Sequence, residues 1–512
     1  MVPITIMTED AAGAKRFRAN SENDTIRINA AGGFAIVTQR NRETASGNVT
    51  RDRPMSATAT AVRLVDRYSV AFPGSKRRFE IAKGIFPTGV THDTRMMDPF
   101  PPYVTHAKGA YKWDVDGHKL IDYFVGHGAL LLGHSPDDIV AAVQEQMAKG
   151  THYGSCHDLE IEWGQLVQKL VPSAEKVRFT GSGTEATLMA LRLSRLHTGR
   201  PKFLKLHGHF HGWHDYVAVG SDPPYDAPGV PGVPDGVAAN CVAVPPNDLN
   251  LVEAALRNDS QIGAVILEPT GGHWGAVPIR GEFLQGLREL CSHRDCVLIF
   301  DEVITGFRVA PGGAQAFYGI VPDLTSMAKI LAGGLPGGAL AGRTDIMAFL
   351  EPRPGKPKMK HPGTYNANPL SAAAGVAALK RVATGEPCRK ATAAAVRLRN
   401  GLNELFESRD WPLVAYGDFS MVRIVPEYTG PRPSSNAGAN DGFIPYSGDL
   451  NALDGPKNMK QLFAMRQAML LNGVELWGFA GMTSCEHNDA VIDATVRAVE
   501  VSVEMLRAEE ML

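Results

Sequence analysis

Residues 297–343 read VLIFDEVITGFRVAPGGAQAFYGIVPDLTSMAKILAGGLPGGALAGR, and this stretch decides the fold. Its first four residues, 297–300, are apolar and mostly branched, which is typical of a buried strand in a parallel sheet. A carboxylate, Asp301, follows where that strand should end, and ligands of open α/β sheets bind at that end. Lys329 is the only charged residue among residues 324–342, so its amine is either a surface group or a desolvated one.

A desolvated lysine near a strand-end carboxylate suits the chemistry of pyridoxal phosphate. A lysine with a lowered pKa forms a Schiff base with an aldehyde, and a carboxylate can keep the pyridine nitrogen of the cofactor protonated. Neither residue is diagnostic alone, because a strand-end Asp is more often a cap and an isolated Lys more often faces solvent. A phosphate site and a ring-stacking residue elsewhere in the chain would make the pair specific.

Residues 180–186, TGSGTEA, lie between an expected strand and an expected helix. The N–H groups of a helix N-terminus, small residues around Gly183 and the hydroxyls of Ser182 and Thr184 form a cradle for a phosphate monoester. The same letters fit the G-x-G-x-x-A pattern of dinucleotide-binding proteins, which requires an acidic residue about 20 positions further on. No Asp or Glu occurs in residues 187–214, so we favour the phosphate monoester. A well-capped helix that binds nothing is the structural alternative.

Residues 207–214, HGHFHGWH, contain four histidines after an expected strand and suggest a zinc site. No second cluster of Cys, His or Asp at ligand spacing supports that interpretation. Cys291 and Cys296 flank His293 but lack a second ligand pair. We therefore expect no metal site.

Four segments together resemble the class III aminotransferases, which are fold type I pyridoxal phosphate enzymes. The segments are IFDEVITGFR at 299–308, SMAK at 326–329, FTGSGTEATLMALR at 179–192 and HPGTYNANPLSAAAG at 361–375. They follow the order of the family, and the resemblance covers about residues 85 to 505. The branch that this chain resembles contains glutamate-1-semialdehyde aminomutase and the β-amino acid aminotransferases.

The resemblance implies a role for each residue that would surround the cofactor ring. Lys329 matches the Schiff-base lysine, which also moves a proton between substrate and cofactor carbons. Asp301 matches the partner of the pyridine nitrogen, and Glu268 matches a carboxylate near the phenolic edge of the ring. Phe210 and Val303 match the residues that pack on opposite faces of the ring.

The resemblance also implies contacts to the phosphate and to the substrate. Ser182, Gly183 and Thr184 match the phosphate cradle. Thr364 matches a hydroxyl that reaches the phosphate held by the neighbouring subunit, so a homodimer with shared sites is expected. Arg95 matches the arginine that holds a substrate carboxylate, a role that suits its planar, forked guanidinium group.

Two departures from the aminomutase pattern influence the predicted reaction. Residues 91–93 are Thr-His-Asp where the aminomutase carries Asn-Ser-Pro, and residues 272–275 are Gly-His-Trp-Gly where it carries Gly-Asn-Met-Gly. We therefore predict an aminotransferase that moves an amino group from an amino acid, with a β-amino acid as one candidate, to a keto acid acceptor. Glutamate-1-semialdehyde 2,1-aminomutase, which transfers the amino group within one molecule, is the alternative. A catalytically silent binding protein of the same fold is a third interpretation.

The composition of the 512-residue chain is that of a globular protein that acts on small molecules. Hydrophobic residues make up 44% and charged residues 21%, and the formal net charge is -2. This charge gives no reason to expect nucleic acid or an anionic membrane as partner, and no stretch is apolar enough to span a bilayer. Six scattered cysteines favour a reducing compartment, so we expect a cytoplasmic protein. Residues 1–54 fit neither a signal nor a transit peptide.

The order of expected elements predicts an α/β fold with a mostly parallel sheet flanked by helices. We expect a smaller α+β domain built from the N- and C-terminal segments. The predicted parts are a poorly ordered extension at 1–54, the N-terminal segment of the small domain at 55–124, the large cofactor-binding domain at 125–385 and a C-terminal α+β domain at 386–512. The segment 427–455 is rich in Pro, Gly, Ser and Asn, which is typical of a surface loop or lid.

Overall fold

The computed structural model describes residues 16–18, 25–28, 34–37, 63–227, 229–433 and 442–512. The chain forms two compact units, Met1–Ala61 and Val62–Leu512. The first contains an antiparallel sheet of three short strands, β1 (Arg16–Arg18), β2 (Thr25–Ile28) and β3 (Phe34–Val37). These strands are not predicted by the sequence pattern. Most of the expected poorly ordered extension lies outside the described residues, so that expectation stays a prediction.

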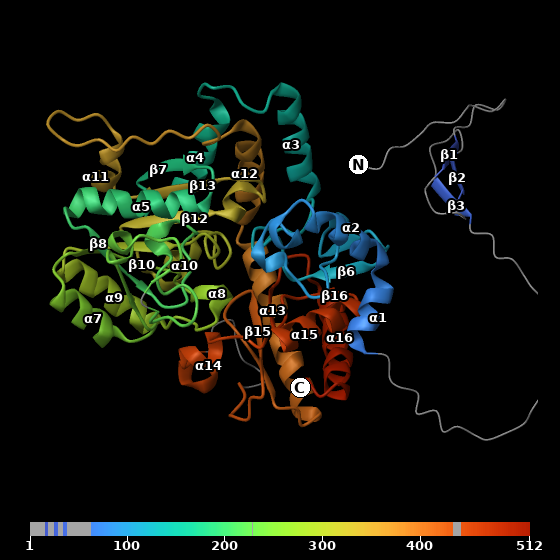
Figure 1. The fold of residues 1–512 in the computed structure, drawn as a ribbon. Coiled ribbons are helices and arrows are strands. Elements are labelled where there is room, and N and C mark those ends of the chain that lie inside the picture. Colours follow the sequence, from blue (N-terminus) through green and yellow to red (C-terminus); the bar gives the residue numbers. More distant parts are fainter. Residues whose placement is uncertain (1–15, 19–24, 29–33, 38–62, 228, 434–441) are drawn as a thin grey trace, which may run out of the picture. The chain divides into compact units, whose positions relative to one another are not determined.

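A seven-stranded sheet forms the centre of one half of the larger unit (Figure 1). Its spatial order is β7-β13-β12-β11-β10-β8-β9; β13 is antiparallel to both neighbours, and the other neighbouring strands are parallel. The strands are β7 (Lys176–Thr180), β8 (Lys202–Leu206), β9 (Cys241–Val244), β10 (Ile262–Leu267), β11 (Val297–Asp301), β12 (Leu324–Ala328) and β13 (Gly338–Gly342). The predicted mostly parallel sheet is confirmed.

Helices cover both faces of this sheet because its central strands are apolar on both sides. In β11, Leu298 and Phe300 pack in one cluster with α7 and α9, whereas Val297 and Ile299 pack in another with α5. A third cluster joins α3, α4 and α12 to β12 and β13. These helices are α3 (Asp137–Lys149), α4 (Asp158–Leu170), α5 (Gly183–Thr198), α7 (Leu249–Asn258), α9 (Gly281–His293) and α12 (Pro369–Val382).

Strand β12, which ends just before Lys329, is not predicted by the sequence pattern because two of its residues are polar. Thr325 and Ser326 are nevertheless fully buried. The Thr325 hydroxyl oxygen accepts a hydrogen bond from Gln315 Nε2 at 3.1 Å, and Ser326 Oγ donates to Asp301 Oδ1 at 3.2 Å. Buried polar groups are tolerated when they are hydrogen-bonded, so β12 is a central strand despite its composition.

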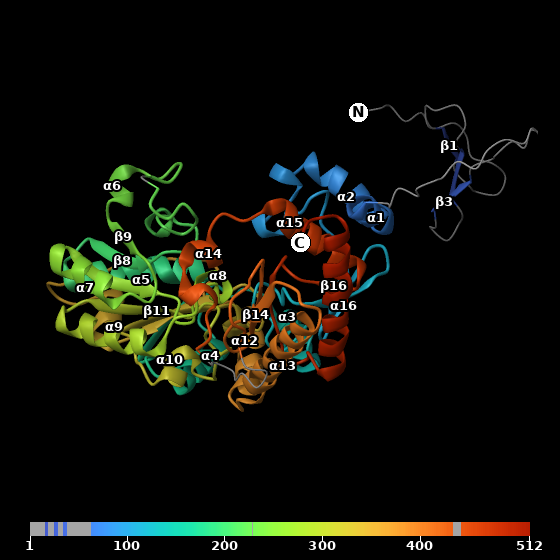
Figure 2. The same ribbon diagram turned by 90° about the horizontal axis from the view of Figure 1, so that it is seen from below.

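The N- and C-terminal segments of the larger unit pack together beside this half (Figures 1 and 2). Strand β6 pairs with β16 in the sheet β16-β6-β5-β4, and β14-β15-β17 form an antiparallel sheet. The strands are β4 (Val104–Lys108), β5 (Tyr111–Asp114), β6 (Lys119–Asp122), β14 (Leu413–Tyr416), β15 (Met421–Pro426), β16 (Val474–Glu475) and β17 (Ala480–Met482). The longer helices are α1 (Leu64–Ala71), α2 (Pro73–Lys83), α13 (Glu386–Ser408), α15 (Met459–Leu471) and α16 (Asp489–Ala508).

Residues 64–83 form two helices and not one continuous helix. The break is at Phe72, between α1 and α2, because Pro73 has no N–H group with which to continue the helix. Short helices occur within loops of both halves. They are α6 (Asp235–Ala238), α8 (Gly272–Gly275), α10 (Gly313–Tyr318), α11 (Thr344–Met347) and α14 (Leu450–Asp454).

The predicted fold class, a mostly parallel sheet between helices with a smaller α+β part from both ends, is confirmed. The domain boundaries predicted at 125 and 386 stay predictions. Within the described residues, every helix is too short or too polar to cross a bilayer.

The central strand should dominate the stability of the larger half. Leu298 on β11 is 0% exposed, and we expect Leu298→Ala to lower the free energy of unfolding by about 2–5 kcal/mol, since it leaves a cavity between the sheet and α9. Leu251→Ala, which truncates a side chain that is 42% exposed on α7, is the matched control and should have a small effect. Urea unfolding followed by circular dichroism measures both. Equal losses would contradict the assignment of β11 as the core strand.

Candidate active site

Three candidate residues lie at the carboxyl ends of adjacent parallel strands. Leu267 of β10 is paired with Phe300 of β11, so Glu268 and Asp301 follow at the same level of the sheet. Asp301 is paired with Ser326 of β12, and Lys329 begins the turn after that strand. Ligands of open α/β sheets bind at this edge, so the register alone places two carboxylates and one amine around a common space.

Asp301 is held rigidly in a buried position. The residue is 3% exposed, and its Oδ2 accepts a hydrogen bond from His211 Nδ1 at 2.7 Å. Its Oδ1 accepts from Ser326 Oγ at 3.2 Å and from the Val303 N–H at 3.1 Å. These donors fix the orientation of a carboxylate, which can accept about four bonds and so has capacity left for the protonated nitrogen of a ring.

His211 is a residue whose role the sequence analysis missed, because it was considered only as part of a possible zinc loop. Burial lowers the pKa of its imidazole, and the contact with Asp301 opposes that shift. The neutral ring therefore donates through Nδ1 to the carboxylate. Its sequence signal is its place directly after Phe210, in the aromatic-His-Gly motif of the family. Among the described residues, no group of three or more His, Cys, Asp or Glu side chains is placed to hold a metal ion.

Lys329 has the environment that a nucleophilic amine requires. Burial lowers the pKa of its amine, the carboxylates of Asp301 and Glu268 oppose the shift, and the buried guanidinium of Arg308 adds to it. The backbone of Lys329 is left-handed, with φ 56°. A lysine held in this strained conformation directly after a strand projects from a fixed point, and such strain is concentrated at functional sites.

Glu268 and Phe210 are joined by a hydrogen bond. The Phe210 N–H donates to Glu268 Oε1 at 2.8 Å. Burial and the nearby charge of Asp301 raise the pKa of Glu268 to about 8, so this carboxyl is largely protonated at neutral pH. The Phe210 side chain is 54% exposed although its loop is anchored, so a face of its ring is available for stacking.

The phosphate cradle lies at the start of α5 and requires its glycines. Ser182 caps the helix by accepting a hydrogen bond from the Glu185 N–H at 3.3 Å. A Cβ atom on Gly183 would lie 2.8 Å from Val303 Cγ2, and one on Gly212 would lie 2.7 Å from Thr184 Oγ1. The cradle therefore packs directly against Val303 and against the loop that carries Phe210.

These residues fit pyridoxal phosphate by the chemistry of their donors and acceptors. Backbone N–H groups and hydroxyls at the start of α5 suit a phosphate. Asp301 suits a protonated ring nitrogen, and Phe210 and Val303 suit the two faces of the ring. Lys329 suits the aldehyde, so one part of the site matches each part of the cofactor.

Arg95 and Thr364 lie outside this group. Arg95 is exposed in a turn after α2, where its Nη1 donates to Thr91 Oγ1 at 2.9 Å. Thr364 is also exposed, and its carbonyl oxygen accepts a hydrogen bond from His152 Nε2. Within the described residues the Thr364 side chain has no hydrogen bond to the cradle of its own chain. The expected contact with a neighbouring subunit therefore stays a prediction.

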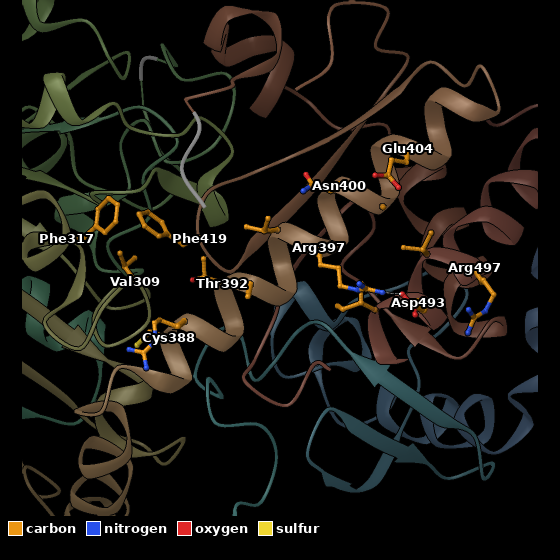
Figure 3. Close-up of a pocket in the computed structure, with 16 residues that line it drawn as sticks. Val309, Phe317, Cys388, Thr392, Arg397, Asn400, Glu404, Phe419, Asp493 and Arg497 are labelled. Atoms are coloured by element: carbon orange, nitrogen blue, oxygen red, sulfur yellow. Dashed lines mark hydrogen bonds and ion pairs between the residues drawn. The ribbon is translucent and has the colours of Figure 1, made fainter. Parts of the chain in front are cut away.

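A cavity of about 1070 Å³ lies elsewhere, along α13 and α16 (Figure 3). Its lining residues include Thr392 and Asn400 of α13, Phe317 of α10 and Phe419 of the loop between β14 and β15. None of the candidate site residues lines this cavity. We place the active site at the sheet edge, because Asp301, Glu268 and Lys329 come together there.

This chain is similar to known proteins over most of its length. The family model described as Aminotransferase class-III matches residues 93–414. A glutamate-1-semialdehyde 2,1-aminomutase of Methanopyrus kandleri is 44% identical over 346 residues, which cover 67% of this chain and 80% of that protein. The protein of the same name from Methanocaldococcus jannaschii is 37% identical over 431 residues, covering 83% of this chain and 97% of that protein. The crystal structure of an omega-transaminase from Sphaerobacter thermophilus has a TM-score of 0.75 at 31% identity, covering 84% of this chain and 98% of that one.

These relatives overturn the reaction predicted from the sequence. The prediction of intermolecular amino transfer to a keto acid is wrong, because the similar curated proteins are named as aminomutases, which was the alternative. The prediction relied on the replacements at 91–93 and 272–275. Neither segment contains any of the residues that match the cofactor, so the prediction relied on positions outside the cofactor site.

The family match spans more than half of the chain, and the site has a fitting group for each part of the cofactor. This protein belongs to the class III aminotransferase family and is a pyridoxal-phosphate-dependent enzyme.

Proposed function

We propose that the enzyme is an aminomutase of the glutamate-1-semialdehyde 2,1-aminomutase type. The observation that carries the proposal is the similarity to curated proteins of that name, at 37% identity over 83% of this chain in one case. In such a reaction an amine and a carbonyl exchange places on neighbouring carbons of one molecule. The reaction therefore needs neither an amine donor nor a keto acid acceptor.

The chain supplies the groups that such a reaction needs around the cofactor. Bound pyridoxal phosphate provides an aldehyde that combines with amines and a ring that withdraws electrons from the attached carbon. We propose that Asp301, oriented by His211, keeps the ring nitrogen protonated. Phe210 and Val303 hold the ring between them.

Lys329 is the proposed proton carrier. Burial lowers the pKa of its amine, which makes the neutral form easier to reach, and a neutral amine can accept a proton from one substrate carbon and return it to another site. Arg95 is proposed to bind the substrate carboxylate. This anchor matters more in a mutase than in a transaminase, because the carbon skeleton must stay in the site through both halves of the reaction.

The proposed reaction can be tested directly. Purified enzyme loaded with pyridoxal phosphate should convert glutamate-1-semialdehyde completely with no added amine or keto acid, and the product can be measured by chromatography. A strict requirement for an added keto acid would contradict the proposal.

The identity of the nucleophilic lysine gives a second test. Borohydride reduction followed by peptide mapping should place the pyridoxyl group on Lys329, and Lys329→Ala should lower turnover by at least about 10³-fold. Lys205 is the internal control. Burial also lowers the pKa of its amine, to about 8, but Lys205 lies within strand β8 and not at the end of a strand, so it should stay unlabelled. A label on Lys205 would show that the assignment of Lys329 is incorrect.

The raised pKa of Glu268 predicts how stability depends on pH. Between pH 4.5 and about 8 the unfolded chain releases this proton while the folded protein keeps it, so the folded state loses stability as pH rises. Glu268→Gln removes this loss. Between pH 4.5 and 8, the free energy of unfolding of the cofactor-free variant should therefore rise by on the order of 3–5 kcal/mol relative to that of the cofactor-free wild type. Urea unfolding at several pH values measures the difference, and Glu289→Gln on the exposed side of α9 is the control. A difference in the free energy of unfolding between Glu268→Gln and wild type that stays constant with pH would contradict the raised pKa of Glu268.

We also propose a homodimer in which Thr364 reaches the phosphate site of the neighbouring subunit. Two exposed aromatic residues support an interface near Thr364. Tyr365, which is 66% exposed, follows Thr364 in the chain, and Tyr153, which is 44% exposed, follows His152, the residue hydrogen-bonded to Thr364. Large exposed apolar side chains that gather in one place mark contact surfaces.

Light scattering should give a mass twice that of one chain. Loss of a hydrogen bond to a charged phosphate should weaken the binding of pyridoxal phosphate to Thr364→Val by roughly 10- to 100-fold. Thr384→Val is the control, because the Thr384 hydroxyl donates to Arg381 O of its own subunit at 2.7 Å. Fluorescence titration of the cofactor measures both variants. A monomer, or unchanged affinity in Thr364→Val, would count against the shared site.

A further inference from the structure

Two histidines that are far apart in the sequence form a stacked pair next to Arg95. The rings of His92 and His127 have centroids 4.8 Å apart and planes inclined by 16°. His92 lies in the turn that contains Arg95, whereas His127 follows β6. Nothing in the cofactor contacts described above uses either ring, so the pair needs its own explanation.

The hydrogen bonds of His92 determine which of its nitrogens is free. The ring Nδ1 accepts a hydrogen bond from the Thr94 N–H at 3.2 Å, which closes the turn. A neutral imidazole that accepts at Nδ1 carries its proton on Nε2. His92 therefore presents an N–H donor on the side away from its own turn.

His127 is held in place at a conformational cost. Residues 125–128 all have positive φ, including 40° at Val125 and 55° at His127, which are unfavourable for side chains with a Cβ. The Asp122 carboxylate accepts from the Val125 N–H at 3.1 Å, and Arg308 Nη2 donates to the Gly128 carbonyl at 2.8 Å. Two buried charged groups thus stabilise a strained loop, and such strain is typical of functional sites.

The strained loop presents an imidazole without a hydrogen-bond partner. The ring of Phe124 meets that of His127 edge-on, with centroids 5.7 Å apart, and this contact restricts its rotation. Within the described residues, neither ring nitrogen of His127 has a hydrogen-bond partner. A half-buried polar group that is rigidly positioned and unsatisfied is suited to bind a ligand.

The charges around the pair favour an anion. The positive charges of Arg95 and Lys329 both act to lower the pKa of each ring, after the larger effect of burial, and Lys112 acts in the same sense on His127. Asp93 opposes the shift at His92. The two stacked imidazoles, both able to donate hydrogen bonds, therefore lie within the field of the Arg95 and Lys329 charges, which favours an anion beside them.

We infer that His92 and His127 are specificity-determining residues that bind the substrate carboxylate together with Arg95. The inference rests on the proposed function, because it assigns the pair to the substrate of that reaction. Arg95 supplies the charge, and the His92 Nε2–H supplies a directed hydrogen bond. His127 covers the carboxylate and supplies a second ring nitrogen. This arrangement selects an amino compound that carries a carboxylate over one that lacks it.

The test compares two simple amines that differ only in the carboxylate. Enzyme loaded with pyridoxal phosphate is titrated calorimetrically with 5-aminopentanoate and with 1-aminopentane, and the ratio of the two Kd values measures the preference for the carboxylate. We expect His92→Ala and His127→Ala each to reduce this ratio by about 5- to 30-fold, mainly by weakening the binding of 5-aminopentanoate. Circular dichroism verifies that each variant is folded.

Two further variants keep the result interpretable. His127→Asn retains a hydrogen-bond donor and tolerates positive φ, so it should restore part of the ratio lost in His127→Ala. His106→Ala is the matched control, since His106 also stacks on a ring, that of Trp113, with centroids 4.7 Å apart. The ratio should be unchanged in that control.

An unchanged ratio in both alanine variants, or equal weakening for the two amines, would overturn the inference and assign the pair a structural role. The outcome is independent of the reaction assignment, because binding is measured without turnover. A carboxylate preference that depends on the pair, in an enzyme that fails to convert glutamate-1-semialdehyde alone, would refute the proposed function and leave the subsite in place.

Discussion

The parallel register of β10, β11 and β12 is the constraint on which the active site depends. Parallel neighbours end at the same edge, so Glu268, Asp301 and Lys329 converge although 61 positions separate the first from the last. Two buried carboxylates on neighbouring strands, those of Glu268 and Asp301, repel each other when both are charged. The structure reduces this cost in two ways. The pKa of Glu268 is raised so that it is largely neutral, and Asp301 receives hydrogen bonds from His211 and Ser326.

Left-handed backbone occurs in the turn after β12, in the loop after β6 and in α8. Lys329 and His127 have φ values of 56° and 55°, and His273 and Trp274 in α8 have 47° and 62°. Conformations of this kind persist only where the surroundings hold them. For His127 the holding groups are Asp122 and Arg308, both buried. Asp122 ends β6 in the smaller α+β part, whereas Arg308 follows β11 of the seven-stranded sheet, so both halves of the larger unit hold this loop.

The sequence predicted the regular apolar strands and the motif-bearing turns, but it did not predict features that depend on tertiary partners. Residues 297–300 are apolar throughout, so β11 could be predicted. Strand β12 could not be predicted, because its polar residues Thr325 and Ser326 are buried only through hydrogen bonds to Gln315 and Asp301, which come from other elements. His211 was assigned no role for the same reason: its partner is 90 residues away in the chain. The stacking of His92 on His127 is likewise invisible in the separate motifs.

The reaction type was mispredicted because the aminomutase and the transaminase share the residues that contact the cofactor. The prediction therefore relied on the replacements at 91–93 and 272–275, which lie outside the residues that match the cofactor. The replacement at 272–275 illustrates this point. His273 Nδ1 donates to the buried Asp454 at 2.5 Å, and Arg423 Nη1 donates to the His273 carbonyl. The altered turn is thus tied to α14 and β15, so it makes the wall rigid without touching Lys329 or Asp301.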